Sequence, residues 1–399
     1  MSQSSEPVFI VEGARTPIGR FNGSLAGHAA TDLGGHAIST ALERSGIDAT
    51  EVDHVVMGHV LTAGEGQSAA RNASVKGGVG MDVPAVTVNK VCLSGLQAIN
   101  YGWMLIASGQ ADVVVAGGME SMTRSPYLLP KARSGYGYGH GEVIDSLLFD
   151  GLTCAVESVL MGEGTDSYAQ AEQIGRAAQD AYAAESHERA ARAIKDGILA
   201  SEIAPVSIPQ RKGDPILFEE DEGVRPGTDV TSLGGLRPAF MTDGTVTAGN
   251  ASQISDGASA MVLASAATAE RLGVTPLAEL VSFGNVAGPD NCSLLQQPST
   301  AIMAAAERAG VAVADIDLFE VNEAFAAVAV ASLDHLGVSG EIVNVNGGAI
   351  AVGHPLGMSG NRIALTAAHE LRRRGGGLAA AGLCGGGGQG DALLLRVSG

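Results

Sequence analysis

A cysteine lies where the apolar pattern of the chain changes from that of a strand to that of a helix. Val86, Val88 and Val91 favour a strand just before Cys92, and the apolar residues over 93–106 then recur at helical spacing. The start of a helix carries partial positive charge and unpaired N–H groups, which lower a thiol pKa and can hold an oxyanion. This position is typical of a nucleophilic cysteine; the alternative is a small buried apolar residue.

Three further stretches of the chain follow predicted strands in its C-terminal third. They are 321–325 (VNEAF), 346–355 (NGGAIAVGHP) and 384–390 (CGGGGQG). They supply an amide, an imidazole and a second thiol, and the glycines let backbone N–H groups approach a ligand closely. Each stretch alone is also compatible with a structural turn, but chemistry in open α/β sheets gathers beyond the ends of strands.

The elements that must position these residues alternate between short apolar runs and Ala-rich helices. In the first half, strands are predicted at 8–11, 55–57, 86–91 and 112–116, and helices at 31–45, 67–76 and 93–106. In the second half, strands are predicted at 258–264, 277–286, 316–321, 342–345, 378–383 and 392–397, and helices at 299–309, 324–336 and 359–374. Thr31 or Asp32 is the expected N-cap of the first helix, and Gly46 its stop. The alternation predicts a mostly parallel sheet covered by helices, built as two similar α/β halves.

The alternation of strands and helices stops over 125–241, a segment rich in Gly, Pro, Tyr and charged residues. One helix is predicted there, over 165–197. A long insertion of this kind usually covers a site or binds a ligand. The alternative is a solvent-exposed segment with no functional role.

The composition excludes several classes of protein. The net charge of −19 over 399 residues argues against nucleic acid as a partner. None of the four cysteines lies in a C-x-x-C pair, so no metal site or thioredoxin-like site is predicted, and Cys154 and Cys292 are interpreted as structural. The N-terminus lacks the pattern of a signal peptide and the apolar runs are too short for a membrane span, so we expect a cytoplasmic protein with free thiols.

Together with Cys92, the three stretches resemble the thiolase family (acyl-CoA C-acetyltransferases) in order and approximate spacing. The resemblance extends over nearly the whole chain and also includes 12–17 (EGARTP), 117–122 (GGMESM), 236–240 (LRPAF) and 247–252 (TAGNAS). It implies an α/β, thiolase-like fold, in which two similar βαβαβαββ halves form a five-layer α-β-α-β-α sandwich with an inserted loop domain. The expected domains are an N-terminal half, 1–124 completed by 250–274, a coenzyme A-binding loop domain, 125–249, and a C-terminal half, 275–399.

The resemblance also implies a reaction and a role for each residue. Thiolases condense two acetyl-CoA to acetoacetyl-CoA, or cleave 3-ketoacyl-CoA, through an acyl-cysteine. By resemblance Cys92 is the nucleophile, activated by His354, and Cys384 is the second acid/base. Asn322 holds a water that stabilises the enolate with His354, and the N–H groups of Cys92 and Gly386 form the oxyanion hole.

Coenzyme A is then a substrate, and no tightly bound cofactor is implied. The resemblance places Arg225 and Ser232 near its adenine end, and Ser252 and Met161 near its pantetheine; the alternative for Arg225 is a solvated loop arginine. Departures from the family pattern lie at Leu93, at Leu160 and over Asp290–Pro298, and they leave the acyl chain length open, whereas Gln389 favours the acetyl-CoA acetyltransferase group. A homodimer or homotetramer is implied.

Two other enzymes remain as alternatives. One is a longer-chain degradative 3-ketoacyl-CoA thiolase, which would use the same residues, since condensation and cleavage share them all. The other is a cysteine-dependent acyl-CoA thioester hydrolase, in which Cys92, His354 and Asn322 imitate a Cys-His-Asn triad. The hydrolase leaves Cys384 and the insertion without a role. A catalytically silent coenzyme A-binding protein is disfavoured by the presence of both cysteines and the histidine.

Overall fold

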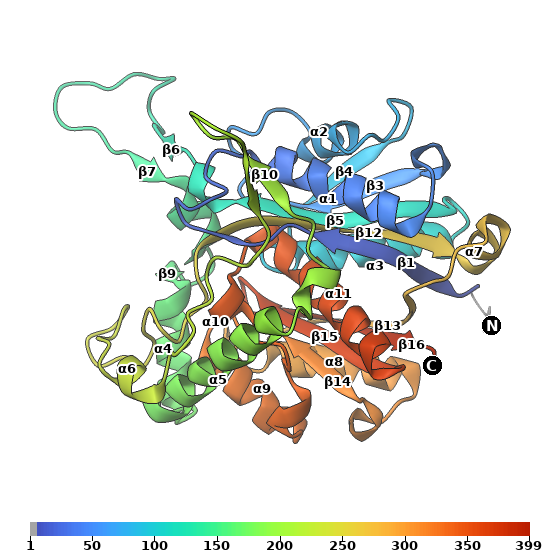
Figure 1. Cartoon of the computed structure of the whole chain (residues 1–399). Helices are drawn as coiled ribbons and strands as arrows, with labels where there is room; N and C mark the ends of the chain where they lie inside the picture. Colours follow the sequence, from blue (N-terminus) through green and yellow to red (C-terminus); the bar gives the residue numbers. More distant parts are fainter. Residues whose placement is uncertain (1–5) are drawn as a thin grey trace.

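The computed structural model describes residues 6–399, and in it two α/β halves are stacked in layers (Figure 1). The strands of the N-terminal half are β1 (Val8–Arg15), β2 (Gly19–Arg20), β3 (His54–Gly58), β4 (Ala85–Val88), β5 (Val113–Ser121) and β12 (Ser255–Ser265). Its helices are α1 (Ala30–Ser45), α2 (Ala69–Lys76), α3 (Ser94–Ala107) and α7 (Ala266–Leu272). The C-terminal half contains β13 (Ala278–Ala287), α8 (Gln297–Ala309), β14 (Leu318–Val321), α9 (Ala326–Leu336), α10 (Ala349–Val352), α11 (Leu356–Arg374), β15 (Gly377–Gly385) and β16 (Gln389–Val397).

The layers are α1 and α2, the N-terminal strands, α3 with α11, the C-terminal strands, and α8 with α9 (Figure 1). The largest apolar core lies where α3 and α11 pack between the two sets of strands, with Leu96 and Ile99 from α3 and Ile363 and Leu365 from α11 fully buried. This arrangement confirms the five-layer α-β-α-β-α sandwich. The two helices of the central layer are the ones that begin next to Cys92 and His354.

The strands form one continuous sheet in the order β14-β15-β16-β13-β1-β12-β5-β3-β4, in which β1 and β13 join the halves through only two residue pairs. Parallel pairing occurs between β3 and β4, β3 and β5, and β14 and β15, whereas the other neighbours are antiparallel. The prediction of a mostly parallel sheet is therefore wrong. Since only the short turn over 386–388 separates β15 from β16, these strands can pair only as a hairpin.

Three local predictions also fail, each for an identifiable reason. The helix predicted over 165–197 is two helices, α4 (Met161–Ala171) and α5 (Arg176–Lys195), because Gln173 adopts a left-handed conformation with φ of 59°. The strand predicted over 342–345 is absent from the described residues, because Asn344 has a φ of 45° and its side-chain amide binds both the N–H and the C=O of Val321. The N-cap of α1 is Ala29, with Asp32 accepting a hydrogen bond from its N–H.

The insertion contributes small elements around α5. They are β6 (Tyr127–Leu128), β7 (Ile144–Asp145), β8 (Thr153–Cys154), β9 (Val159–Leu160), α4, β10 (Val206–Ile208), β11 (Ile216–Phe218) and α6 (Val230–Gly234). In Figure 1 the loop between β6 and β7 extends away from the body, while α4 to α6 lie beside the C-terminal half. Within residues 6–399, no helix is long and apolar enough to cross a membrane.

Candidate active site

Two turns from opposite halves of the molecule face each other at the ends of β4 and β15. A Cβ on Gly385 would lie 2.6 Å from Cγ of Leu93, and a Cβ on Gly386 would lie 3.4 Å from Val91. The absence of a side chain at Gly385 therefore permits the close approach, and the fully buried Leu93 fills the space between the turns. The N–H groups of Cys92 and Gly386 both donate hydrogen bonds to the thiol of Cys92.

The predicted lowering of the Cys92 pKa is wrong for the resting protein. Burial raises the pKa of this thiol to about 12, and the negative charge of Glu120 adds to the effect. Hydrogen bonds from the N–H groups of Cys92 and Gly386 act in the opposite direction but are outweighed. Cys92 is therefore a neutral thiol, and a thiolate forms only if a nearby base takes its proton.

His354 follows Gly353, whose φ of 112° turns the chain between α10 and α11. Its own N–H is held by the carbonyl of Gln253 and the hydroxyl of Ser255, both at 3.2 Å. Its Nδ1 lies 2.6 Å from Oγ of Ser359, and that hydroxyl donates its hydrogen to the carbonyl of Pro355. Because the hydroxyl hydrogen is already used, Ser359 must accept a hydrogen bond from Nδ1–H.

The imidazole of His354 is consequently fixed in the tautomer that leaves Nε2 unprotonated. Burial lowers the pKa of His354 to about 3, and the positive charge of Arg362 contributes. The ring is thus neutral at physiological pH and Nε2 can accept a proton.

Asn322 directly follows β14, and its amide nitrogen Nδ2 lies 3.5 Å from Nε2 of His354. The residue is fully buried, and its Oδ1 has no hydrogen-bond partner among residues 6–399. A buried acceptor of this kind is suited to a water or a polar substrate group.

Cys384 lies near the end of β15 and is fully buried. It belongs to an apolar cluster with Leu294, Leu295, Met161 and Phe325. Burial raises its pKa, and the charge of the neighbouring Cys92 raises it further. Cys384 is therefore also a neutral thiol, close enough to Cys92 for the two to influence each other.

Two functional contacts in this site were missed by the sequence reasoning. One is Ser359, whose position five residues after His354, in the first turn of a predicted helix, is the only available indication. The other is the carboxylate of Glu323, which accepts hydrogen bonds from Tyr182 (3.1 Å), Asn344 (2.9 Å) and Ser186 (2.7 Å). This buried network fixes the turn after Asn322 to α5 of the insertion, which sequence spacing does not reveal.

The residues predicted to contact coenzyme A fall into two groups. Met161 packs in the cluster of Cys384, and the N–H of Ser252 binds the carbonyl of Ala324, two residues after Asn322. Arg225 and Ser232 are exposed on the insertion, in a segment that makes neither of these contacts. Asp229 is the N-cap of α6, and Oγ of Ser232 accepts a hydrogen bond from its N–H while Oδ1 of Asp229 accepts one from the N–H of Ser232. The side chain of Ser232 therefore already has a structural role.

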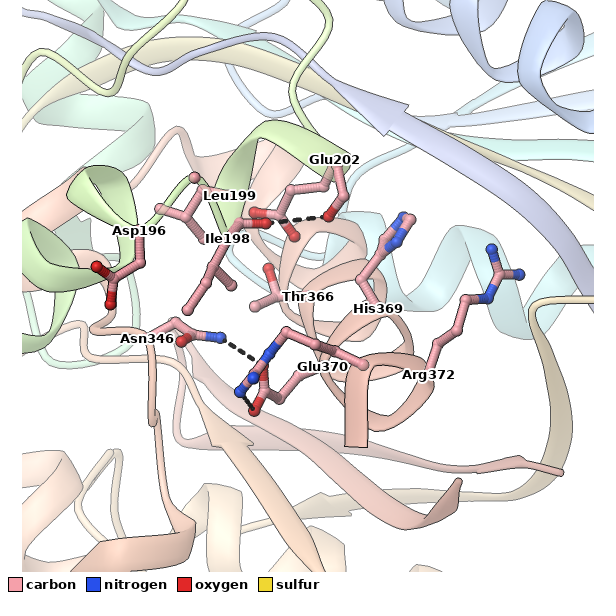
Figure 2. A pocket seen from close by; sticks show the side chains of 12 residues that line it. Asp196, Ile198, Leu199, Glu202, Asn346, Thr366, His369, Glu370 and Arg372 are labelled. Carbon is pink, nitrogen blue, oxygen red and sulfur yellow. Dashed lines mark hydrogen bonds and ion pairs between the residues drawn. The ribbon is translucent and has the colours of Figure 1, made fainter. Parts of the chain in front are cut away.

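A separate hollow of about 340 Å³ lies between the end of α5 and the last turns of α11 (Figure 2). Its charged side chains largely satisfy one another, as in the pair Arg373–Glu370 at 2.6 Å and the bond from Asn346 to Glu370 at 3.0 Å. Its lining contains none of the four predicted catalytic side chains. The chemistry expected from the sequence is therefore located at the facing turns and not in this hollow.

Comparison with known families gives two adjacent matches that together span most of the chain. Residues 8–267 match the model described as "Thiolase, N-terminal domain", and residues 274–397 match "Thiolase, C-terminal domain". A "Probable acetyl-CoA acetyltransferase" of Mycolicibacterium smegmatis is 56% identical over 97% of this chain and all of its own length. An "Acetyl-CoA acetyltransferase" of Pseudomonas aeruginosa is 47% identical over 98% of this chain and 99% of its own length.

The fold is also similar to a solved structure. The crystal structure of the Bacillus anthracis acetyl-CoA acetyltransferase superimposes with a TM-score of 0.96 and 37% sequence identity. The similarity covers 99% of this chain and 100% of that one.

Proposed function

The chain belongs to the thiolase family, and from this premise we propose that it condenses two acetyl-CoA to acetoacetyl-CoA, reversibly, through acetyl-Cys92. The observation that carries the proposal is the pair of thiols on facing turns, the partly buried Cys92 and the buried Cys384, with the neutral imidazole of His354 two residues before Leu356 in the apolar cluster that Cys92 contacts. Acyl transfer alone needs one thiol, whereas carbon–carbon bond formation needs a second acid/base.

In the first step, Nε2 of His354 takes the thiol proton while the sulfur of Cys92 attacks the carbonyl carbon of acetyl-CoA. The new carbon–sulfur bond forms and the bond to coenzyme A breaks; the proton on His354 passes to the departing thiolate. The N–H groups of Cys92 and Gly386, which already point at this sulfur, would stabilise the tetrahedral oxyanion.

In the second step, the thiol proton of Cys384 would pass to Nε2 of His354, and the resulting thiolate would remove a proton from the methyl carbon of a second acetyl-CoA. The enolate oxygen would be stabilised by His354 and by a water held on Oδ1 of Asn322. The enolate carbon then attacks the acetyl carbon, the bond to Cys92 breaks, the proton on His354 returns to the sulfur of Cys92, and acetoacetyl-CoA leaves. Thiolysis runs through the same groups in reverse, so a longer-chain degradative thiolase differs only in the space allowed for the acyl chain. The apolar wall of Met161, Leu294 and Phe325 beside Cys384 supports a short acyl group.

The hydrolase alternative is disfavoured by a specific contact. In a Cys-His-Asn triad the amide would orient the ring nitrogen that does not face the nucleophile. Here Ser359 holds Nδ1 of His354, and Asn322 lies at Nε2 instead. Asn322 is thus placed to act on the substrate beside His354 and not to orient the ring from behind.

We also propose that the insertion, 125–249, binds coenzyme A as a substrate, between halves formed by 1–124 with 250–274 and by 275–399. Met161 and Ser252 would contact the pantetheine, and Arg225 and Ser232 the adenine end. Arg225 is exposed. Burial of His187 and the positive charge of Arg225 lower the pKa of this histidine to about 4. A cation at this position suits the phosphates of coenzyme A in a chain of strongly acidic composition.

We further propose that the protein is a cytoplasmic homodimer or homotetramer. β4 is an edge strand, and Val86 on it and Tyr101 and Met104 on α3 expose apolar surface. An unpaired strand edge beside exposed apolar side chains is suited to a second copy of the chain. The projecting loop between β6 and β7, with Tyr138 fully exposed, would join two dimers.

The decisive test is Cys384→Ala. The variant should form acetyl-Cys92 from acetyl-CoA in a normal or modestly slowed burst, measured by intact-protein mass spectrometry. Condensation and thiolysis, measured by acetoacetyl-CoA absorbance, should both be lost. Cys384→Ser should fail as well, since a hydroxyl is a far weaker acid than a thiol. Condensation at close to the parent rate would make Cys384 structural and overturn the two-thiol mechanism.

A further inference from the structure

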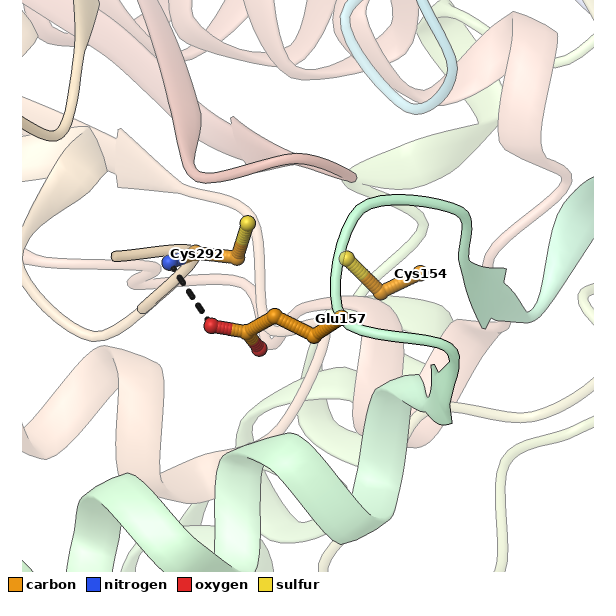
Figure 3. Close-up of side chains that lie close together, drawn as sticks. All are labelled: Cys154, Glu157 and Cys292. Atoms are coloured by element: carbon orange, nitrogen blue, oxygen red, sulfur yellow. Dashed lines mark hydrogen bonds between the residues drawn. The ribbon is translucent and has the colours of Figure 1, made fainter. Parts of the chain in front are cut away.

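Two cysteines outside the catalytic site face each other across the boundary between the insertion and the C-terminal half (Figure 3). Cys154 ends β8, Glu157 lies in the turn between β8 and β9, and Cys292 lies in the loop between β13 and α8. One ligand atom from each residue, the two Sγ atoms and a carboxylate oxygen, lies within 4.8 Å of the other two. Cys154 is buried and Cys292 is partly buried.

From this geometry we propose that Cys154, Glu157 and Cys292 form a binding site for one Zn²⁺ ion, whose fourth position is open to water. Two thiolates and a carboxylate are ligands that Zn²⁺ accepts in tetrahedral geometry. Zinc–sulfur distances of about 2.3 Å in a tetrahedron place two sulfurs about 3.8 Å apart, so closing the site requires movements of about 1 Å or less.

The carboxylate of the proposed site is already oriented by neighbouring groups. Oε1 of Glu157 accepts hydrogen bonds from the hydroxyl of Tyr168 and from the N–H of Cys292, the latter at 3.2 Å. The turn that places Glu157 next to Cys154 is closed by the N–H of Ser158, which binds the carbonyl of Cys154 at 2.7 Å. Such outer contacts orient metal ligands and are a usual part of metal sites.

Metal binding at this cluster would exchange protons for the ion. Zinc binds cysteine as the thiolate, so Zn²⁺ would displace one proton from each thiol to solvent, and form two zinc–sulfur bonds and one bond to a carboxylate oxygen of Glu157. The release of two protons offsets the charge of the added ion.

The proposed zinc site would also hold in place the loop with Cys292, which packs against the catalytic turn. The N–H of Gly288 binds the carbonyl of Gly388 at 2.7 Å, and a Cβ on Gly388 would lie 2.8 Å from Cα of Cys292. The loop with Cys292 therefore packs directly against the turn that contains Gly386. Bound Zn²⁺ would tie this loop to the β8–β9 hairpin next to Leu160. The site itself does not depend on the proposed reaction.

The test uses the full chain with Cys92→Ser and Cys384→Ser, so that the catalytic thiols cannot bind metal, kept reduced with a phosphine and freed of metal. Co²⁺ is the spectroscopic probe, and Zn²⁺ is then added to displace it. We expect one Co²⁺ per chain with sulfur-to-cobalt charge transfer, and two protons released per Zn²⁺. Adding Cys154→Ser or Cys292→Ser should abolish the charge transfer, and Tyr168→Phe should weaken binding about tenfold, as loss of an outer contact does.

A second measurement covers variants that fail to fold. In the unmodified chain, Zn²⁺ should protect Cys154 and Cys292 from N-ethylmaleimide, as mapped by mass spectrometry. Charge transfer that survives removal of both cysteines, binding of less than one Co²⁺ per chain, or no protection of these two thiols would overturn the proposal.

Discussion

Replacing Ser359 by alanine should slow acetylation of Cys92 while leaving the fold intact. The hydroxyl of Ser359 lies 2.6 Å from Nδ1 of His354 and holds the proton on that nitrogen. Without it, the tautomer with Nδ1–H has a buried donor with no partner, which costs about 1–3 kcal/mol. The proton then moves to Nε2, where it prevents this nitrogen from accepting the proton of Cys92. An energy of that size corresponds to about a 5- to 150-fold lower population of the competent tautomer.

The assay is a single-turnover acetylation followed by mass spectrometry, and the expected loss is therefore about 5- to 150-fold in rate. The matched control is Ser282→Ala, since Ser282 is also buried and its hydroxyl donates to a carbonyl, that of Ala305, at 2.7 Å. The control should lose less than about twofold in rate, because Ser282 has no contact with a catalytic group. The ¹⁵N shifts of His354 report the tautomer directly. Acetylation of the Ser359→Ala variant at the control's rate, with Nδ1 still protonated, would refute the assignment.

Three further predictions concern other groups. His354→Ala should lower both acetylation and condensation by at least about 100-fold, because base and enolate donor are lost together; near-normal acetylation would contradict its role. Although burial raises the pKa of Cys92 to about 12, iodoacetamide should modify this thiol first, because the neutral imidazole of His354 can take its proton, and prior acetylation should protect it; first labelling of Cys154 or Cys292 with activity retained would argue against it. Burial raises the pKa of Glu320 to about 8, above the usual carboxyl value, so its protonated form stabilises the folded state at low pH and this contribution is lost as pH rises towards 8. The denaturant midpoint should fall between pH 5 and pH 8, and it should fall less for Glu320→Gln than for the parent protein. An equal fall in both would contradict the raised pKa of Glu320.

Local sequence patterns predicted the elements that position the site. The change of period around Cys92 placed the end of β4 and the start of α3 within a few residues, because both elements bury an apolar face with its own spacing. The same holds for the strands before Asn322 and Cys384. The failures lie where a single side chain or backbone angle overrides the pattern. Asn344 occupies the place of a strand by binding Val321 through its side chain, and no periodicity encodes that contact.

The protonation states of the catalytic side chains could not be predicted from the sequence. A helix start predicts a lowered thiol pKa, yet burial raises that of Cys92, because the groups that exclude water come from distant parts of the chain. Leu93 and Leu356 illustrate this: one packs against Gly385 from the other half, and the other lies in the apolar cluster that Cys92 contacts. The tautomer of His354 likewise depends on three-dimensional placement of one hydroxyl.

The mutual influence of the two thiols favours one order of events. Cys92 and Cys384 both have a raised pKa, and a negative charge on Cys92 would raise that of Cys384 further. Two thiolates side by side would therefore repel each other, so Cys384 ionises most easily while Cys92 carries no charge. Acetyl-Cys92 is a neutral thioester and has no proton to lose, whereas free Cys92 can lose its proton to His354. In the proposed order, acylation of Cys92 followed by proton abstraction by Cys384, the two negative charges never have to exist together.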